Sequence, residues 1–376
     1  MKTVIKNGTV LLPDFKTFSK KNILIEDDRI IGFCESENAD KVIDANGKYI
    51  LPGLIDIHTH GSMGKNYASD ENIDDALIYS AKAGTTTVAP TIANFPFDEL
   101  VSYIKGIVSY AKKQPIGANI AGIHLEGPFI SMEKKGAMHP PTIEATLENF
   151  NKLIDAGEGF IKVMTIAPER ENALEIISEG KKRGVRMSIG HTVASVEETE
   201  AAIKAGATGA THTFNAMKSL LHRDPGVLGG VLTSPEVTCE AICDFVHLSP
   251  AIVKLIYLAK GADGMVLISD SGAQAGLPDG EYTIGGFVKV VKDGVCVVKG
   301  TTTISGSVCP ISYGAKNLLK LGIPMNEVSK IGSYNPAKAL GIENEVGAID
   351  AGKRADLIIV DGEFNIERVL VRGKEI

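Results

Sequence analysis

The sequence predicts a (β/α)₈ barrel of the TIM type, accompanied by a small β-sandwich domain formed from both chain termini. Through the middle of the chain, short apolar segments alternate with segments of helical periodicity, and both ends contain short strand patterns separated by turns. Eight repeats of strand and helix favour a closed barrel over an open sheet. The strands are expected at residues 54–58, 86–91, 120–126, 161–166, 186–191, 210–214, 237–242 and 265–270.

Helix boundary signals lie between these strands. Residues 70–83 place apolar side chains on one helical face and are followed by a glycine. Residues 195–198 have the form of a capping box, and the helix that they open is expected to end at Gly206. The segment 276–306 departs from the alternation and reads as an inserted hairpin that turns at residues 292–294.

Both ends of the chain are predicted to form short strands joined by turns, at residues 3–10 and 22–33 at the start and 355–373 at the end. Neither end is long enough to bury a core alone, so we expect the two to combine. The predicted barrel domain spans residues 52–340, and the predicted sandwich joins residues 1–51 to residues 341–376.

Composition and charge restrict the class of protein. The 376 residues are 44% hydrophobic and 23% charged, as in soluble globular enzymes. The net charge of −7 argues against nucleic acid or an anionic membrane as the main partner. No apolar run resembles a signal peptide or a membrane span. The five cysteines are odd in number and lack C-x-x-C spacing, so we expect reduced thiols and a cytoplasmic location.

The segment Leu-Pro-Gly-Leu-Ile-Asp-Ile-His-Thr-His-Gly (51–61) is the most informative part of the sequence. His58 and His60 are two residues apart at the end of an expected strand, so their side chains point to the same face. Two adjacent imidazoles can chelate a divalent metal ion. The alternative is an ordinary pair of core or surface histidines. Further histidine and acidic residues at other strand ends argue against that alternative.

Four of these further residues are Glu126, His191, His212 and Asp270, each at the end of a different expected strand. In a barrel of this type the carboxyl ends of the strands meet at one face, where active sites lie. Four imidazoles and one carboxylate can hold one or two divalent ions and leave a position open for water. Asp270 then suits a general base. This set of groups indicates metal-assisted hydrolysis of a C–N bond.

The chain resembles the amidohydrolase superfamily and, within it, the family of N-acetylglucosamine-6-phosphate deacetylases. The wider resemblance depends on Pro-Gly-Leu-Ile-Asp-Ile-His-Thr-His (52–60), the strand-end histidines and Asp270. The narrower one depends on His-Leu-Glu-Gly-Pro-Phe (124–129), Thr-His-Thr-Phe-Asn-Ala-Met (211–217) and Arg-Asp-Pro-Gly (223–226). It covers essentially the whole chain.

The resemblance implies that Glu126, His191 and His212 are the principal metal ligands and that Asp270 is the general base and acid. The chain also keeps His58 and His60, which could hold a second ion. The site is therefore expected to bind either one or two divalent ions. Zinc is the expected ion, with iron, manganese and cobalt as alternatives.

The resemblance also implies a set of substrate-binding residues, with Asn215, Ala216 and Arg223 at a phosphate and His247 at the sugar. In the family a histidine directly follows the Lys-Gly-Ala motif. Here Met138 intervenes after Ala137, so the corresponding histidine is His139, one residue later. The expected substrate-binding residues are Ala137, His139, Asn215, Ala216, Arg223 and His247.

The implied reaction is deacetylation of N-acetylglucosamine 6-phosphate to glucosamine 6-phosphate and acetate in amino-sugar catabolism, by a homodimer with no nucleic-acid or membrane partner. One alternative is N-acetylgalactosamine 6-phosphate or another acylated amino sugar. A second is another superfamily C–N hydrolysis, such as a cyclic amidase or nucleobase deaminase reaction. A third is a catalytically silent binding protein, which we expect to have lost metal ligands that this chain keeps.

Overall fold

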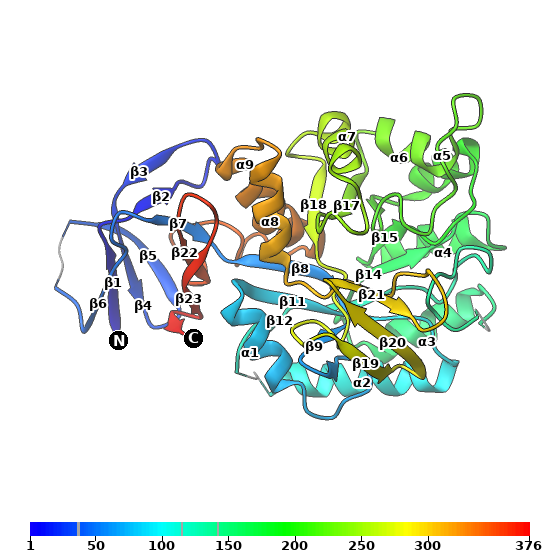
Figure 1. Ribbon diagram of the computed structural model, residues 1–376, viewed down its shortest axis with the longest axis horizontal. Helices are drawn as coiled ribbons and strands as arrows, with labels where there is room; N and C mark the ends of the chain where they lie inside the picture. The colour runs from blue at the N-terminus through cyan, green and yellow to red at the C-terminus, as the bar shows by residue number, and fades with distance from the viewer. Residues whose placement is uncertain (36–37, 114–115, 141–142) are drawn as a thin grey trace.

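The computed structural model describes residues 1–35, 38–113, 116–140 and 143–376. Within these residues, parallel strands form a barrel in which each strand pairs with its neighbour except at one seam (Figure 1). The short β12 (Asn119–Ile120) extends the sheet beside the start of the second strand. In order, the barrel strands are β8 (Leu54–Thr59), β11 (Thr85–Ile92), β13 (Ile123–Leu125), β14 (Ile161–Ile166), β15 (Arg186–Ile189), β16 (Gly209–Ala210), β17 (Thr238–Ile242) and β18 (Met265–Ile268).

The seam between β8 and β18 is joined just beyond the strand ends. The backbone N–H of Asp270 donates to the carbonyl of His58 at 2.9 Å, and the N–H of His60 donates to the carbonyl of Ser271 at 2.7 Å. These bonds place the first histidine segment beside the last strand end. The nearly closed ring of parallel strands confirms the predicted barrel. The predicted small β-sandwich domain is also confirmed by the sheets described below.

Several barrel strands end earlier than the sequence predicts. His191, His212 and Asp270, expected inside strands, have φ angles of 48°, 28° and 49°. A strand cannot continue through a residue with positive φ, and non-glycine residues adopt such angles mainly in turns and at strained functional sites. The three side chains therefore lie in the loops that immediately follow β15, β16 and β18.

Helices surround the barrel and share one apolar core with it, to which Leu77, Ile104, Leu153 and Ile176 contribute. They are α1 (Asp74–Lys82), α2 (Phe97–Lys112), α3 (Leu147–Ala156), α4 (Ala173–Lys182), α5 (Val196–Ala205), α6 (Gly226–Thr233), α7 (Pro250–Lys260), α8 (Ile311–Lys320), α9 (Met325–Ser329) and α10 (Asn335–Leu340). A π-helical turn, Lys330–Tyr334, joins the last two.

Two helix predictions can be compared directly with the structure. The capping box is present: the Ser195 hydroxyl accepts from the N–H of Glu198, the Glu198 carboxylate accepts from the N–H of Ser195, and α5 ends at Gly206. The first helix begins at Asp74, later than the predicted residue 70. Asp70 instead accepts a hydrogen bond from the N–H of Asn66 at 2.6 Å, which holds the preceding segment in a turn.

Both chain ends enter the small domain at one side of the barrel (Figure 1). One of its sheets has four strands, in the order β5 (Arg29–Cys34), β4 (Asn22–Glu26), β1 (Lys2–Lys6), β6 (Lys41–Asp44). The other has six strands, in the order β24 (Lys374–Glu375), β23 (Ile366–Val371), β22 (Leu357–Val360), β7 (Tyr49–Pro52), β2 (Thr9–Leu11), β3 (Phe18–Lys20). Antiparallel pairing of β7 with β22 joins the two ends of the chain, and Ile5, Ile23, Leu357 and Leu370 share one buried core. The domain limits at residues 51/52 and 340/341 remain predictions.

The predicted hairpin is a three-stranded antiparallel sheet of β19 (Gly280–Ile284), β20 (Phe287–Lys292) and β21 (Val295–Val298). It turns at Asp293 and Gly294, as predicted, and also at Gly285 and Gly286, where φ is +61° and +80°. A short β9 (Gly61–Ser62) pairs with β10 (Lys65–Asn66) after the first barrel strand. Among the described residues, no helix has the length and apolar character needed to cross a bilayer.

Candidate active site

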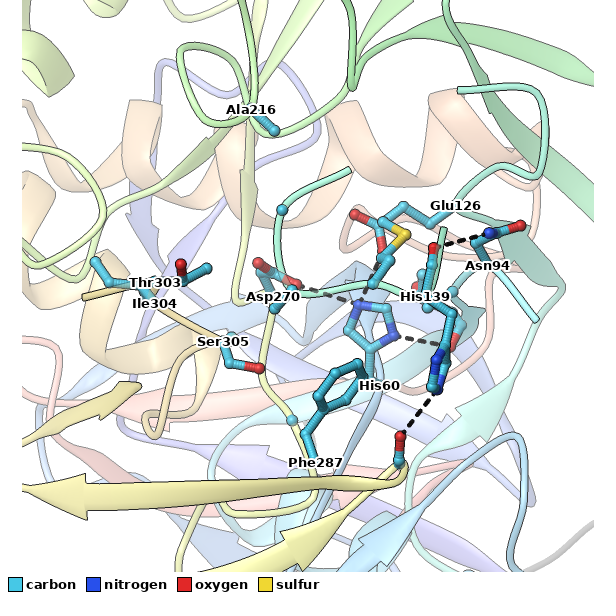
Figure 2. A pocket seen from close by; sticks show the side chains of 18 of the residues that line it. His60, Asn94, Glu126, His139, Ala216, Asp270, Phe287, Thr303, Ile304 and Ser305 are labelled. Atoms are coloured by element: carbon cyan, nitrogen blue, oxygen red, sulfur yellow. Dashed lines mark hydrogen bonds and ion pairs between the residues drawn. The ribbon is translucent and has the colours of Figure 1, made fainter. Parts of the chain in front are cut away.

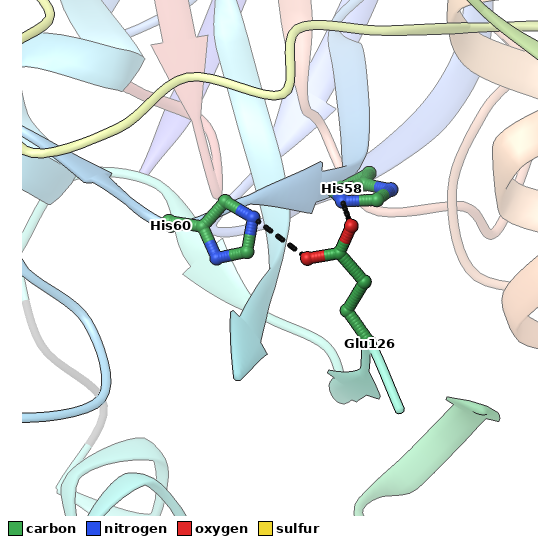
Figure 3. A group of neighbouring side chains, drawn as sticks. All are labelled: His58, His60 and Glu126. Atoms are coloured by element: carbon green, nitrogen blue, oxygen red, sulfur yellow. Dashed lines mark ion pairs between the residues drawn. The ribbon is translucent and has the colours of Figure 1, made fainter. Parts of the chain in front are cut away.

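A buried carboxylate, Glu126, lies at the centre of the candidate site. It follows β13 and faces the two histidines of the first barrel strand (Figure 3). Its Oε1 atom is 3.4 Å from Nε2 of His58, and its Oε2 atom is 3.2 Å from Nε2 of His60. The predicted same-face placement of these histidines therefore brings them to one carboxylate. We call His58, His60 and Glu126 the first ligand group.

The same carboxylate also belongs to a second ligand group with His191 and His212. The Nε2 atom of each histidine is 2.9 Å from Oε1 of Glu126, and the two Nε2 atoms are 2.9 Å from each other. All three side chains are buried. Glu126 is thus shared between the two groups and lies between four imidazoles.

Asp270 completes the cluster from the last barrel strand. Its Oδ1 atom is 3.3 Å from Nε2 of His60 and 3.5 Å from Nε2 of His58. The five strand ends that carry these residues are far apart in the sequence but lie around one mouth of the barrel. The structure therefore brings together all six residues that the sequence predicted as metal ligands or general base.

The donor atoms fit a divalent metal ion. Nδ1 of His60 is 3.1 Å from the carbonyl of Thr91, and Nδ1 of His191 is 2.6 Å from the carbonyl of Lys134. Because a carbonyl only accepts, each of these Nδ1 atoms carries a proton, and the Nε2 atoms face the cluster, where they can ligate a metal ion once they are deprotonated. Nε2 of His58 is buried without a hydrogen-bond partner among the described residues. Imidazole nitrogen with carboxylate oxygen is a ligand set typical of zinc and its neighbours.

The two carboxylates of the cluster are held in their charged form. Burial alone raises the pKa of Glu126, but the charge of His58 and hydrogen bonds from His191 and His212 outweigh it and bring the pKa well below its usual value. Burial likewise raises the pKa of Asp270, and the hydrogen bond and charge of His60 outweigh it. Both groups are therefore available as anionic ligands or bases.

His124 lies beside the cluster but does not join it. Its Nδ1 is 3.1 Å from the carbonyl of Ile57, and its Nε2 is 2.8 Å from the hydroxyl of Thr165. Burial, with the nearby charge of His58, lowers its pKa to about 3. With both ring nitrogens satisfied, His124 is a neutral structural side chain.

A pocket of about 460 Å³ opens above the cluster (Figure 2). Of the six residues predicted to bind substrate, five line it: Ala137, His139, Asn215, Ala216 and His247. The Nδ1 atom of His247 is 2.6 Å from a carboxylate oxygen of Asp244, which orients the ring. Arg223, the sixth, lies in an exposed loop before α6 and does not line the pocket.

His139 connects its loop to the three-stranded hairpin. Its Nε2 is 3.3 Å from the carbonyl of Gly285, and its ring centre is 4.8 Å from that of Phe287 (Figure 2). Its own carbonyl accepts from the side chain of Asn94 at 3.0 Å. His139, which lies one residue later than the histidine of the family motif, therefore still lines the pocket wall.

Sequence reasoning missed two charged residues of the site. Lys289, on β20, lines the pocket, and burial lowers the pKa of its ammonium group; the hairpin around it has no recognisable motif. Glu240 lies in the middle of β17, fully buried, with its carboxylate 3.2 Å from Nδ1 of His58. A single acidic residue within an apolar strand was a signal that pointed to it, because a buried charge requires a partner.

Comparisons with known proteins agree with this geometry. A model of the amidohydrolase family matches residues 49–376. The chain is 33% identical to the N-acetylglucosamine-6-phosphate deacetylase of Bacillus subtilis, over 98% of this chain and 93% of that protein. It is 31% identical to the N-acetylgalactosamine-6-phosphate deacetylase of Escherichia coli O157:H7, over 89% of each.

Solved structures give the same result. The N-acetylglucosamine-6-phosphate deacetylase of Pasteurella multocida superposes with a TM-score of 0.93 at 27% identity, covering all of both chains. A mutant of the Mycobacterium smegmatis N-acetyl-D-glucosamine-6-phosphate deacetylase, in complex with that sugar phosphate, superposes with a TM-score of 0.91 at 31% identity, covering 100% of this chain and 98% of that one. The chain belongs to the amidohydrolase family.

Proposed function

We propose that this protein removes the acetyl group from N-acetylglucosamine 6-phosphate, giving glucosamine 6-phosphate and acetate in amino-sugar catabolism. The observation that carries the proposal is the position of Asp270 against two ligand groups that share Glu126, at the base of a pocket large enough for a monosaccharide phosphate. The deacetylases reported above, which act on N-acetylated amino-sugar phosphates, support this substrate class.

Glu126, His191 and His212 are the proposed ligands of one divalent ion, and His58 and His60 with Glu126 those of a second. Zinc is the proposed metal, because imidazole nitrogen and carboxylate oxygen suit it. A divalent ion bound there supplies Lewis acidity, which polarises the amide carbonyl and lowers the pKa of water.

Asp270 is the proposed general base and acid. Its carboxylate lines the pocket and is kept ionised, so it can take a proton from the attacking water and return it to the leaving nitrogen. His60, 3.3 Å away, holds the carboxylate in place. Proton transfer in both directions by one group accounts for both halves of amide hydrolysis.

The pocket wall supplies the proposed contacts to the sugar phosphate. His247 and His139 lie where a sugar ring would pass, and Asn215 and Ala216 offer polar groups to the phosphate. Lys289 adds a positive charge to the wall, which favours an anionic substrate. Arg223 can contact the phosphate only if its loop moves or if it serves the pocket of a partner subunit, which suits the homodimer that we propose. A cytoplasmic location also remains part of the proposal.

The test is acetate release from N-acetylglucosamine 6-phosphate by the purified protein, with bound metal quantified on the same sample. We expect release that a chelator abolishes and added metal restores. If metal is bound and no acetate appears, the sugar assignment is wrong. Unphosphorylated N-acetylglucosamine serves as the control for the contribution of the phosphate.

N-acetylgalactosamine 6-phosphate is the second candidate substrate. The Escherichia coli relative that acts on it is about as similar to this chain as the glucosamine relatives are. The shifted His139 lies at the pocket wall, where it could contact the sugar hydroxyl whose orientation differs between the two epimers. Comparing kcat/KM for the two epimers under one set of conditions decides between them.

A further inference from the structure

Glu240 is a buried carboxylate to which the proposed reaction assigns no role. It lies in β17 between Cys239 and Ala241, and its exposed fraction is 0%. Burying a charged carboxylate among apolar side chains is unfavourable unless specific partners compensate for the lost hydration. The contacts of Glu240 therefore indicate why the chain keeps it.

One carboxylate oxygen of Glu240 contacts both ligand groups. Its Oε2 atom is 3.2 Å from Nδ1 of His58 and accepts a hydrogen bond from the backbone N–H of His212 at 3.4 Å. Its Oε1 atom has no hydrogen-bond partner among the described residues. Arg186, on β15 two strands away, contributes a favourable charge, but no ion pair joins it to Glu240 among the described residues. The direct partners of the carboxylate are thus a metal-ligating side chain and the backbone of another.

The contact with His58 selects one tautomer of its ring. A charged carboxylate only accepts hydrogen bonds, so Nδ1 carries a proton, and Nε2, which faces Glu126 and Asp270, is the nitrogen left to ligate a metal ion. Without Glu240, a proton on Nε2 would find acceptors in those two carboxylates. The ring would then present no lone pair to a metal ion.

No other described group performs this task for His58. The neighbouring ring of His124 packs at 4.6 Å from that of His58, but both of its nitrogens are satisfied by Ile57 and Thr165. Backbone carbonyls orient His60 and His191, as described above. His58 differs from these two because its orienting partner is a side chain, which a substitution can remove.

We propose that Glu240 is a positioning residue that holds His58 as a metal ligand and so enables the first ligand group to bind a second divalent ion. The inference depends on the metal site of the proposed function. Glu240 also adds a third buried carboxylate to those of Glu126 and Asp270. Three negative charges in one buried cluster favour two divalent cations over one.

The experiment measures metal content in four proteins: wild type, Glu240→Leu, Glu240→Gln and His58→Asn. Each is stripped with a chelator, loaded with Zn²⁺, desalted and analysed by mass spectrometry for zinc per subunit. We expect wild type to hold two ions and His58→Asn one. Glu240→Leu should match His58→Asn, with affinity for the second ion reduced about 10- to 100-fold, as is typical when the partner of a metal-ligating histidine is lost.

Glu240→Gln is the matched control for hydrogen bonding without charge. Its amide oxygen can accept from both His58 and the His212 N–H, so it should restore binding of the second ion at lower affinity. If Glu240→Leu holds two ions, or if wild type holds only one, the inference is wrong.

A second readout concerns the protonation of the His58 ring and is made on zinc-loaded wild type labelled with ¹⁵N-histidine. The nitrogen shifts should show a proton on Nδ1 of His58 and none on Nε2, and the signal is identified by its absence in His58→Asn. A proton on Nε2 would overturn the inference. Neither readout depends on acetate release. If the sugar assignment is wrong, both readouts can still support the role of Glu240, so the two failures can be told apart.

Discussion

Nε2 of His60 lies 3.3 Å from Oδ1 of Asp270, so the proposed base of the reaction contacts a residue of the first ligand group. The two residues come from the first and last strands of the barrel and meet across its seam. Backbone hydrogen bonds from His60 to Ser271 and from Asp270 to His58 hold the same two segments together. The contacts that close the barrel therefore also bring the proposed catalytic groups together.

Replacing Asp270 with asparagine should abolish proton transfer without removing a principal ligand. We expect kcat for acetate release to fall by about 10²–10⁴-fold, the usual contribution of a general base. Zinc content per subunit should stay near that of wild type. Near-normal turnover would show that another group takes the proton.

Replacing Glu126 with glutamine should affect both ligand groups, because its carboxylate is shared between them. We expect zinc content to fall for both ions and activity to be lost with it. Glu133→Gln is the matched control, since Glu133 also lines the pocket but is exposed and outside both groups. Retention of one tightly bound ion in Glu126→Gln would contradict the shared role.

Metal removal should destabilise the fold. Without cations, the buried carboxylates of Glu126, Asp270 and Glu240 repel one another, whereas an ion that binds only the folded state stabilises it. We expect the thermal midpoint of chelated protein to lie several degrees below that of zinc-loaded protein and to recover on re-addition. His58→Asn should show a smaller difference between the two forms. An unchanged midpoint in wild type would indicate that the cluster binds no structural ion.

Replacing Lys289 with methionine should weaken binding of the phosphorylated substrate. Its positive charge lines the pocket and has no ion-pair partner among the described residues, so it is free to attract an anion. We expect KM for N-acetylglucosamine 6-phosphate to rise severalfold, and more at low salt, while kcat changes little. Lys292→Met is the control, because Lys292 lies on the same strand but is exposed and outside the pocket. Equal effects of the two variants would rule out a local contact.

Removing the helix cap at Ser195 should lower the stability of the fold without changing the activity. The hydroxyl of Ser195 accepts from the N–H of Glu198, so Ser195→Ala leaves this donor of α5 without its partner. We expect a loss of about 1 kcal/mol in the free energy of unfolding. Acetate release per folded molecule should not change, and denaturant unfolding with activity assays checks both.

Much of the candidate site was predictable because its signals are local. His58 and His60 lie two residues apart on a strand, and the fold rule that gathers strand ends at one face brings Glu126, His191, His212 and Asp270 to them. The capping box at Ser195 is equally local, since its two hydrogen bonds span three residues. Such features depend on chain geometry and need no knowledge of distant contacts.

Other features had no local signal. The exact ends of β15, β16 and β18 coincide with the positive φ angles of residues that follow shortly after each strand. The exposed position of Arg223 and the partly buried position of Lys289 follow from how loops and the hairpin pack around the pocket. Neither residue type nor spacing encodes these outcomes.

The sequence by itself determined the fold class, the metal-binding residue types and their order along the chain, because apolar periodicity and strand-end chemistry are properties of short segments. The tertiary structure alone decided that Glu126 is shared between two ligand groups and that Glu240 touches His58, a residue 182 positions away. Contacts of a few ångströms between distant strands depend on barrel closure and side-chain packing. These are properties of the whole folded chain, which no short segment specifies.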